Sequence, residues 1–196
     1  MARTASGPDG IMAKRLIVAV LPALLLGAAA PGAHAQEGVI TRSEALAAVY
    51  PDATVTRDRV ILTREQMGSV AALARVGMQG RIFPRYVARD EDGAVVGRAY
   101  IDTHTPKTER QSLLISLDTA GRVIRVDVTV FFEPAQYMAP QDWLRQFDGA
   151  VLEDELAIRR GIRPIAGSSF TGRAVSNAVR RVLALDRVLQ GEAVQP

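Results

Sequence analysis

The chain has 196 residues, of which 48% are hydrophobic and 5% aromatic, and its 24 basic and 21 acidic residues give a net charge of +3. It has no cysteine, so disulfides, thiolate zinc sites, iron–sulfur clusters and cysteine-attached haem are all excluded. The basic residues are scattered along the chain and aromatic residues are few, which argues against a nucleic-acid-binding surface.

The first 35 residues have the pattern of a secretory signal peptide. A short basic region (residues 12–15) precedes an apolar run (residues 16–30), and small residues stand at Ala33 and Ala35. The apolar run is shorter than the roughly 20 residues of a membrane span. We therefore predict export to the periplasm with cleavage after Ala35; retention as a single-span membrane anchor is the alternative.

Residues 36–196 would remain after cleavage, enough for one domain with a hydrophobic core. The leader holds three basic residues and one acidic residue, so the remaining chain is close to neutral. His104 would be its only histidine, which excludes a multi-histidine metal site within one chain. Excluding thiolate and multi-histidine metal sites favours an organic cofactor such as flavin.

Residues 36–82 are expected to form a small N-terminal lobe. Thr41 and Glu44 have the spacing of a capping box that opens a short helix, which ends before Pro51. Thr63 and Gln66 repeat that pattern at the start of a second helix. Between the two helices, β-branched residues over 55–62 predict a strand.

The chain from residue 83 to residue 132 is rich in strand patterns. Residues 83–89 and 94–102 flank an Asp/Gly turn, and residues 113–117 and 123–132 repeat the arrangement. In the last of these strands apolar and polar residues alternate, which predicts a half-covered sheet. The residues expected to face the core there are Val126, Val128, Val130 and Phe132.

Two helices are expected after the strands. Residues 140–147 read as a short helix with Trp143 and Phe147 on one side. Residues 171–189 read as a long amphipathic helix, and residues 191–196 as a tail. The expected fold class is therefore α+β, an antiparallel-rich sheet with flanking helices and a long amphipathic C-terminal helix. On that helix the residues expected to lie toward water are Arg173, Asn177, Arg180, Arg181 and Arg187.

The turn before the long helix is the main candidate site. Gly167, Ser168, Ser169 and Thr171 are small or carry a hydroxyl group, and no acidic residue follows in the first helical turn. Free backbone N–H groups and the positive end of the helix dipole make such a start suited to a phosphate group. The ordinary alternative is a helix cap, because serine and threonine commonly fill that role.

Segments upstream of this turn add to the pattern. Residues 123–128 have the β-branched pattern of a strand, Phe132-Glu133-Pro134 has the pattern of a turn, and residues 143–149 read Trp-Leu-Arg-Gln-Phe-Asp-Gly. With the turn at 165–175, these segments resemble, in order, the FMN-binding domain family over roughly residues 93–185. That family includes the flavin-carrying subunits of the Rnf complex and of sodium-translocating NADH:quinone oxidoreductase. Its signature resembles Asp-x-x-Ser-Gly-Ala-Thr-x-Thr-Ser-x-Ala-Val.

The resemblance implies that FMN is attached by a phosphodiester to Ser169, after transfer from FAD by a dedicated flavin transferase. The chain departs from the signature at Arg163, Ala166 and Ser168, and Ser169 replaces the acceptor threonine. Ser168 and Thr171 are competing acceptors. The cofactor-binding residues implied are Ser169, Ser168, Gly167, Thr171, Arg173 and Glu133, with Tyr137 and Trp143 as further candidate neighbours of the flavin.

The function implied is that of an exported electron carrier, whose partners besides the transferase are a membrane or periplasmic redox protein. A noncovalent or degenerate flavin-binding module is one alternative. An exported serine hydrolase is another, because Asp102 and His104 together with a serine would supply a triad. His104 is expected in a loop after a strand, and no G-x-S-x-G motif is present.

Overall fold

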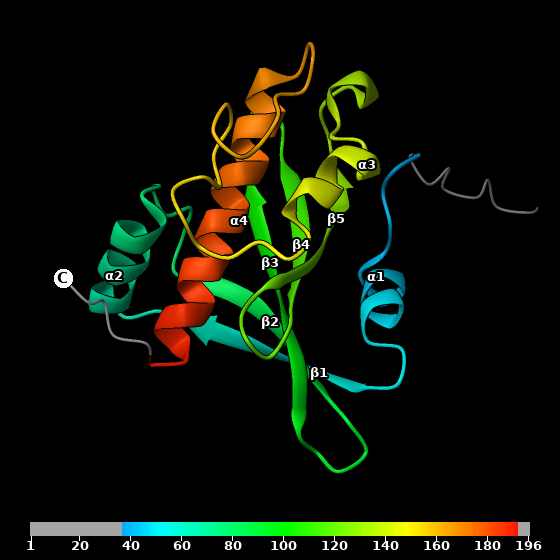
Figure 1. The fold of residues 1–196 in the computed structure, drawn as a ribbon, viewed down its shortest axis with the longest axis vertical. Helices are drawn as coiled ribbons and strands as arrows, with labels where there is room; N and C mark the ends of the chain where they lie inside the picture. Colours follow the sequence, from blue (N-terminus) through cyan, green and yellow to red (C-terminus); the bar gives the residue numbers. More distant parts are fainter. Residues whose placement is uncertain (1–36, 192–196) are drawn as a thin grey trace, which may run out of the picture. The chain divides into compact units, whose positions relative to one another are not determined.

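The computed structural model describes residues 37–191, so the predicted signal peptide and most of the predicted tail lie outside the described residues. The described part is built on one antiparallel sheet whose five strands follow one another in chain order (Figure 1). The strands are β1 (Thr54–Ile61), β2 (Ile82–Arg89), β3 (Val95–His104), β4 (Gln111–Leu117) and β5 (Val123–Phe131).

Two of the connections are tight turns that begin with an aspartate and contain a glycine. After β2, the Asp90 side chain accepts a hydrogen bond from the Ala94 backbone N–H at 2.8 Å. After β4, Asp118 accepts one from the Arg122 backbone N–H at the same distance. Gly121 in the second turn has φ +74°, a conformation that favours glycine. Both predicted hairpins are therefore confirmed.

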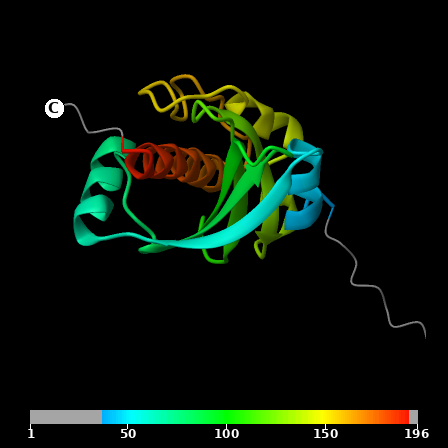
Figure 2. The ribbon, with the colours of Figure 1, turned by 90° about the horizontal axis from the view of Figure 1, so that it is seen from below.

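Four helices lie against the sheet: α1 (Arg42–Val49), α2 (Arg64–Ala74), α3 (Gln141–Leu144) and α4 (Ser169–Leu189). Helix α4, 21 residues long, lies within the curve of the sheet with α2 beside it, and α1 lies on the other side of the sheet (Figure 2). The expected α+β class is thus confirmed.

The two faces of the sheet are covered unequally. The larger apolar cluster joins residues of α2, α3 and α4 to one face, and a smaller cluster joins α1 to the other. Strand β4 is buried along its whole length because both faces of the sheet are covered there. The sequence predicted that one face of the sheet is covered, whereas α1 also covers part of the other face.

The first two helices begin as their sequences predict. The Thr41 hydroxyl accepts a hydrogen bond from the Glu44 backbone N–H, and the Glu44 carboxylate accepts one from the Thr41 backbone N–H, so the capping box of α1 is complete. Thr63 and Gln66 form the same reciprocal pair at the start of α2. Each box satisfies two N–H groups that a helix start would otherwise leave without acceptors.

Residues 37–82 share the sheet and the core of the rest of the described chain. Strand β1 pairs along its length with β2. Helix α2 packs against α4, and the Arg180 guanidinium on α4 donates to the Ala74 carbonyl oxygen at 2.7 Å. The segment predicted as an N-terminal lobe thus supplies one sheet edge and part of the main core.

Strand β5 departs from the predicted alternation near its end. Ser112 on β4 faces Val130, whereas the next residue, Leu113, faces Val128, so Thr129 is an extra residue in β5. A bulge of this kind reverses which side chains face the core. The prediction that Phe132 faces the core is therefore wrong: Phe131 is buried and Phe132 is exposed.

The polar face predicted for α4 is also wrong at two positions. Arg180 and Arg181 are buried, and Arg181 forms two hydrogen bonds with the Asp102 carboxylate of β3. The helical period places both arginines toward water. It does not show that the fold supplies a carboxylate for Arg181 and two backbone carbonyl oxygens for Arg180. Arg173 is exposed as expected.

Candidate functional site

Helix α4 begins without the caps that close α1 and α2. Its N-cap residue, Ser168, makes no capping hydrogen bond with its side chain, and the first turn has no acidic residue. The Gly172 N–H is the first to donate to a backbone carbonyl, that of Ser168 at 3.1 Å. Among residues 37–191 the preceding N–H groups, from Ser169 to Thr171, have no acceptor. These free donors and the helix dipole favour an anion at this point.

The three hydroxyl groups near this start differ in accessibility. Ser168 and Thr171 are buried, with 4% and 3% of their surface exposed. Ser169 is exposed, and its hydroxyl has no hydrogen-bond partner within the described range. Gly167, which precedes them, has φ +74°, so a residue with a side chain would be strained in this turn. Of the predicted acceptors, Ser169 alone presents its hydroxyl to solvent.

A hollow of about 180 Å³ lies beside this turn. Its lining brings together three of the predicted residues of the turn, Gly167, Ser168 and Thr171, and the predicted Glu133 from the segment after β5. The remaining lining residues come from the β3–β4 loop, the segment after β5 and the first turn of α4: Pro106, Lys107, Tyr137 and Phe170. We call this the first hollow.

Glu133 shapes the first hollow by holding its wall. The Glu133 carboxylate accepts hydrogen bonds from the backbone N–H groups of Thr108, at 2.6 Å, and Glu109, at 2.8 Å. The N–H groups of Glu109 and Thr108 hold the pKa of Glu133 below its usual range. The carboxylate therefore fixes the β3–β4 loop, and Lys107 with it, against the segment that follows β5.

Lys107 is the cation of the first hollow, and the sequence reasoning did not identify it as a site residue. Its Nζ lies 5.8 Å from the centre of the Tyr137 ring, a cation–π distance. The only signal available in the sequence was that Lys107 is the sole lysine outside the predicted leader. Its loop position gave no indication of a helix start 60 residues later in the chain.

A second hollow of about 150 Å³ lies next to the first, and Pro106 and Phe170 line both. Phe170 has 59% of its surface exposed and stands on the first turn of α4. The predicted residue Arg173 lines the second hollow and not the first. The other lining residues are Gln79, His104, Thr105, Ala174, Asn177 and Arg181.

His104 reaches the second hollow from a buried network. The prediction that it lies in a loop is wrong, because it is the last residue of β3 and only 6% exposed. Its Nδ1 is 2.7 Å from Asp102 Oδ1, and the same carboxylate accepts hydrogen bonds from Arg181 at 2.8 and 2.9 Å. Burial alone would raise the pKa of Asp102, but the hydrogen bonds from His104 and Arg181 outweigh it and lower the pKa.

Because Asp102 is held as a carboxylate, Nδ1 of His104 carries the proton that it shares with Oδ1. His104 Nε2 is buried and has no hydrogen-bond partner in the described part of the chain. Asp102 and His104 are thus arranged like two members of a hydrolytic triad. The lining of the second hollow contains no serine, so the serine-hydrolase alternative lacks its nucleophile at this point.

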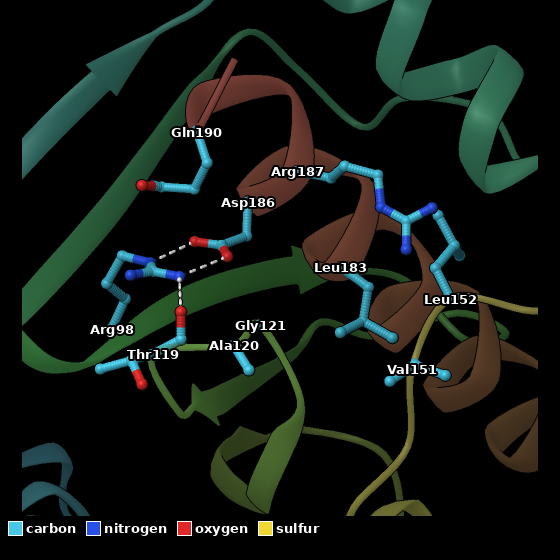
Figure 3. Close-up of a pocket in the computed structure, with 10 residues that line it drawn as sticks. All are labelled: Arg98, Thr119, Ala120, Gly121, Val151, Leu152, Leu183, Asp186, Arg187 and Gln190. Carbon is cyan, nitrogen blue, oxygen red and sulfur yellow. Dashed lines mark hydrogen bonds and ion pairs between the residues drawn. The ribbon is translucent and has the colours of Figure 1, made fainter. Parts of the chain in front are cut away.

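A third hollow, of about 250 Å³, lies at the other end of α4 (Figure 3). Its polar side is formed by Arg98, which donates to both oxygens of Asp186 at 2.6 and 2.8 Å. Tyr100 donates to the same carboxylate at 2.7 Å. Because these buried groups bind one another, we interpret the third hollow as a space beside a structural ion pair.

Other residues singled out in the sequence lie outside the two hollows near the start of α4. Trp143 packs edge-on against Phe147 and donates from its indole nitrogen to the Arg163 carbonyl oxygen at 2.8 Å, so it holds the chain leading to α4. Ser169 does not line either hollow, although Ser168 and Phe170 on each side of it do.

Residues 37–191 contain no cluster of three or more histidine, aspartate or glutamate residues able to hold a metal ion. Over the same range no helix has the length and apolar character needed to cross a membrane. No protein-family model matches the chain, and the comparison with curated proteins finds no significant match, so membership of the FMN-binding domain family stays a prediction from the residues quoted above.

Proposed function

We propose that the protein is an exported flavoprotein that binds FMN at the start of α4 and works as an electron carrier. The observation that carries this proposal is the first hollow. Gly167, Ser168 and Thr171 line it together with Glu133, although Glu133 is more than 30 residues away in sequence. These are four of the six residues that the resemblance implied for one cofactor site; Ser169 and Arg173 lie outside the first hollow.

The chemistry of the first hollow fits a phosphate group. The free N–H groups of the first turn of α4 are donors without acceptors in residues 37–191, and Lys107 adds a full positive charge. The carboxylate in its lining, Glu133, accepts the N–H groups of Thr108 and Glu109 at Oε1 and the Thr108 hydroxyl at Oε2. A phosphodiester, with one negative charge, would meet donors on more than one side.

Covalent attachment would use Ser169. Its hydroxyl is exposed, whereas those of Ser168 and Thr171 are buried and hidden from a modifying enzyme. In the reaction that the resemblance implies, Ser169 Oγ attacks the FMN phosphorus of FAD on the flavin transferase. The bond from that phosphorus to the AMP moiety breaks, AMP leaves, and the hydroxyl proton is lost.

Bound FMN would supply reversible transfer of one or two electrons. The chain's own residues would hold the cofactor and set the charge around it. The partners that we propose are the transferase during maturation and a membrane or periplasmic redox protein afterwards. The alternative, a noncovalent or degenerate flavin-binding module without a redox role, would leave the Ser169 hydroxyl unmodified.

The test is to co-express the chain with a flavin transferase, denature it and look for flavin fluorescence on a gel. Intact mass should show the addition of one FMN less one water. Ser169→Ala should abolish the attached fluorescence because it removes the accessible hydroxyl. Ser169→Thr is the matched control: it keeps a hydroxyl at the same place and should still be labelled.

The outcomes separate the alternatives. If Ser169→Ala keeps the attached flavin and Ser168→Ala or Thr171→Ala loses it, the acceptor is assigned to the wrong residue. No attached flavin in the wild-type chain would refute the covalent form, and a titration with free FMN then tests noncovalent binding. Absence of both would refute a flavin function altogether.

A further inference from the structure

The second hollow holds a buried polar group that the proposed function leaves unexplained. His104 Nε2 has no hydrogen-bond partner within residues 37–191, and the side chain is almost wholly buried. A buried polar atom without a partner is costly, by about 1–3 kcal/mol, and calls for an explanation. Because His104 lines the second hollow, a ligand in that hollow is one source of the missing partner.

The rest of the network holds this imidazole in place. Asp102 binds the Nδ1 side of the ring, and Arg181 on α4 holds both oxygens of Asp102. When the ring carries its one proton on Nδ1, Nε2 is a hydrogen-bond acceptor. The position and the tautomer of His104 are therefore set by β3 and α4 before any ligand arrives.

The lining of the second hollow narrows the class of ligand. Arg173, Asn177 and Gln79 carry hydrogen-bond donors, and Phe170 offers an exposed aromatic face. A planar heterocycle with ring carbonyl oxygens and one N–H group meets all of these: its oxygens accept from the donors, its N–H donates to an acceptor such as Nε2, and its face packs on Phe170.

The two hollows are neighbours in a way that fits one elongated molecule. Both are lined by Pro106 and Phe170, and each alone is smaller than the roughly 300–1,000 Å³ of a typical cofactor pocket. The first hollow has the phosphate-binding features, and the second has the features for a polar heterocycle. Isoalloxazine, the ring of a flavin, is such a heterocycle.

We infer that the second hollow receives the isoalloxazine end of the cofactor and that His104 Nε2 accepts a hydrogen bond from the ring N–H. This inference rests on the proposed function, because it takes the phosphate of the same cofactor to lie at the start of α4. It assigns a recognition role to His104, with Asp102 and Arg181 as the residues that position it.

The test follows the imidazole signals of His104 by NMR. The chain has two histidines, and the spectrum of His104→Gln identifies the signals that belong to His104. Riboflavin, which has the ring but no phosphate, should shift the Nε2 and ring-proton signals of His104 as it is titrated. Inorganic phosphate alone should leave them unchanged, since its expected place is the first hollow.

Two variants should affect riboflavin and FMN differently if the phosphate lies in the first hollow and the ring in the second. His104→Gln should weaken both riboflavin and FMN by about two- to tenfold, the value of one hydrogen bond. Lys107→Gln should weaken FMN but not riboflavin, because it touches the phosphate end. Arg59→Gln, which removes an exposed positive charge outside both hollows, should change neither.

The inference and the proposed function fail in different ways. If flavin becomes attached at Ser169 and the His104 signals do not move, the proposed function stands and this inference is overturned. If no flavin is attached, the riboflavin titration still decides the inference, and unchanged His104 signals overturn it. A shift caused by phosphate and not by riboflavin overturns it as well.

Discussion

Two buried aspartates tie β3 to α4, and their networks end differently. Near the C-terminal end of α4, Asp186 is bound by Arg98 and Tyr100 of β3. Nearer the start of α4 the roles are exchanged: Asp102 lies on β3 and its arginine, Arg181, lies on the helix. Each network thus has one carboxylate, one bidentate arginine and a third group.

The third group makes the difference. The Tyr100 hydroxyl donates its only proton to Asp186, so that network is closed. The Nδ1 atom of His104 is bonded to Asp102, whereas its Nε2 atom is buried without a partner in the described residues, and His104 is one of the residues that line the second hollow. Two networks that share a carboxylate and a bidentate arginine therefore differ at the third group: one is closed, and the other is the one that we propose to be open to a ligand.

The largest expected effect comes from breaking the closed network. Asp186→Ala would leave the buried Arg98 guanidinium without its counter-charge and Tyr100 without its acceptor. We expect a loss of about 3–5 kcal/mol in the free energy of unfolding, the usual result of removing one partner of a buried pair. Urea unfolding followed by circular dichroism measures it.

The control is Asp154→Ala, which breaks an exposed ion pair with Arg75. Exposed pairs contribute about 0–1 kcal/mol, so the midpoint should move little. Equal losses in the two variants would show that the Asp186 network does not hold α4 against the sheet.

Acid should act on the open network through Asp102. Its pKa is lowered in the folded protein because the hydrogen bonds from His104 and Arg181 outweigh the effect of burial. The stabilisation is therefore complete above the ordinary value of about 3.9 and is lost as the pH falls through the lower, folded value. Asp102→Asn should cost about 3 kcal/mol at neutral pH.

The measurement is urea unfolding of the wild-type protein and Asp102→Asn over a series of pH values. The gap between their free energies of unfolding should be constant near neutral pH and should narrow below about pH 4. A gap that stays the same down to the acid limit of folding would contradict a lowered pKa at Asp102.

Features set by neighbours in sequence were predictable. The capping boxes at Thr41 and Thr63 and the turns after Asp90 and Asp118 depend on residues three or four positions apart, and all four are present. The long helix was predicted from its apolar period, and the structure extends it by two residues at its start, to Ser169.

Features set by distant partners were not predictable. The burial of Arg181 depends on Asp102, 79 residues earlier, and the helical period alone placed that arginine in water. The bulge at Thr129 depends on the pairing of β5 with β4, and it moved Phe131 into the core in place of Phe132. The meeting of Glu133 with the turn at 167–171 was implied by resemblance, and Lys107 beside them was not foreseen at all.

The smallest expected effect is that of His104→Gln, and its comparison with Tyr100→Phe separates the two networks best. Tyr100→Phe removes a hydrogen bond to a buried carboxylate and should cost about 1.5–3 kcal/mol. His104→Gln in the flavin-free protein should cost about 1 kcal/mol or less. This variant also removes a hydrogen bond to a carboxylate, but the new amide can still donate to Asp102. It also removes Nε2, whose burial without a partner already destabilises the native protein. Urea unfolding of both variants measures these losses in the free energy of unfolding.

The same measurement with riboflavin tests the ligand. Riboflavin should stabilise Tyr100→Phe as much as the wild-type protein. It should stabilise His104→Gln less, because only that variant has lost the acceptor that the ligand needs. Equal intrinsic losses and equal stabilisation by riboflavin would mean that His104 closes its network as fully as Tyr100 closes the other.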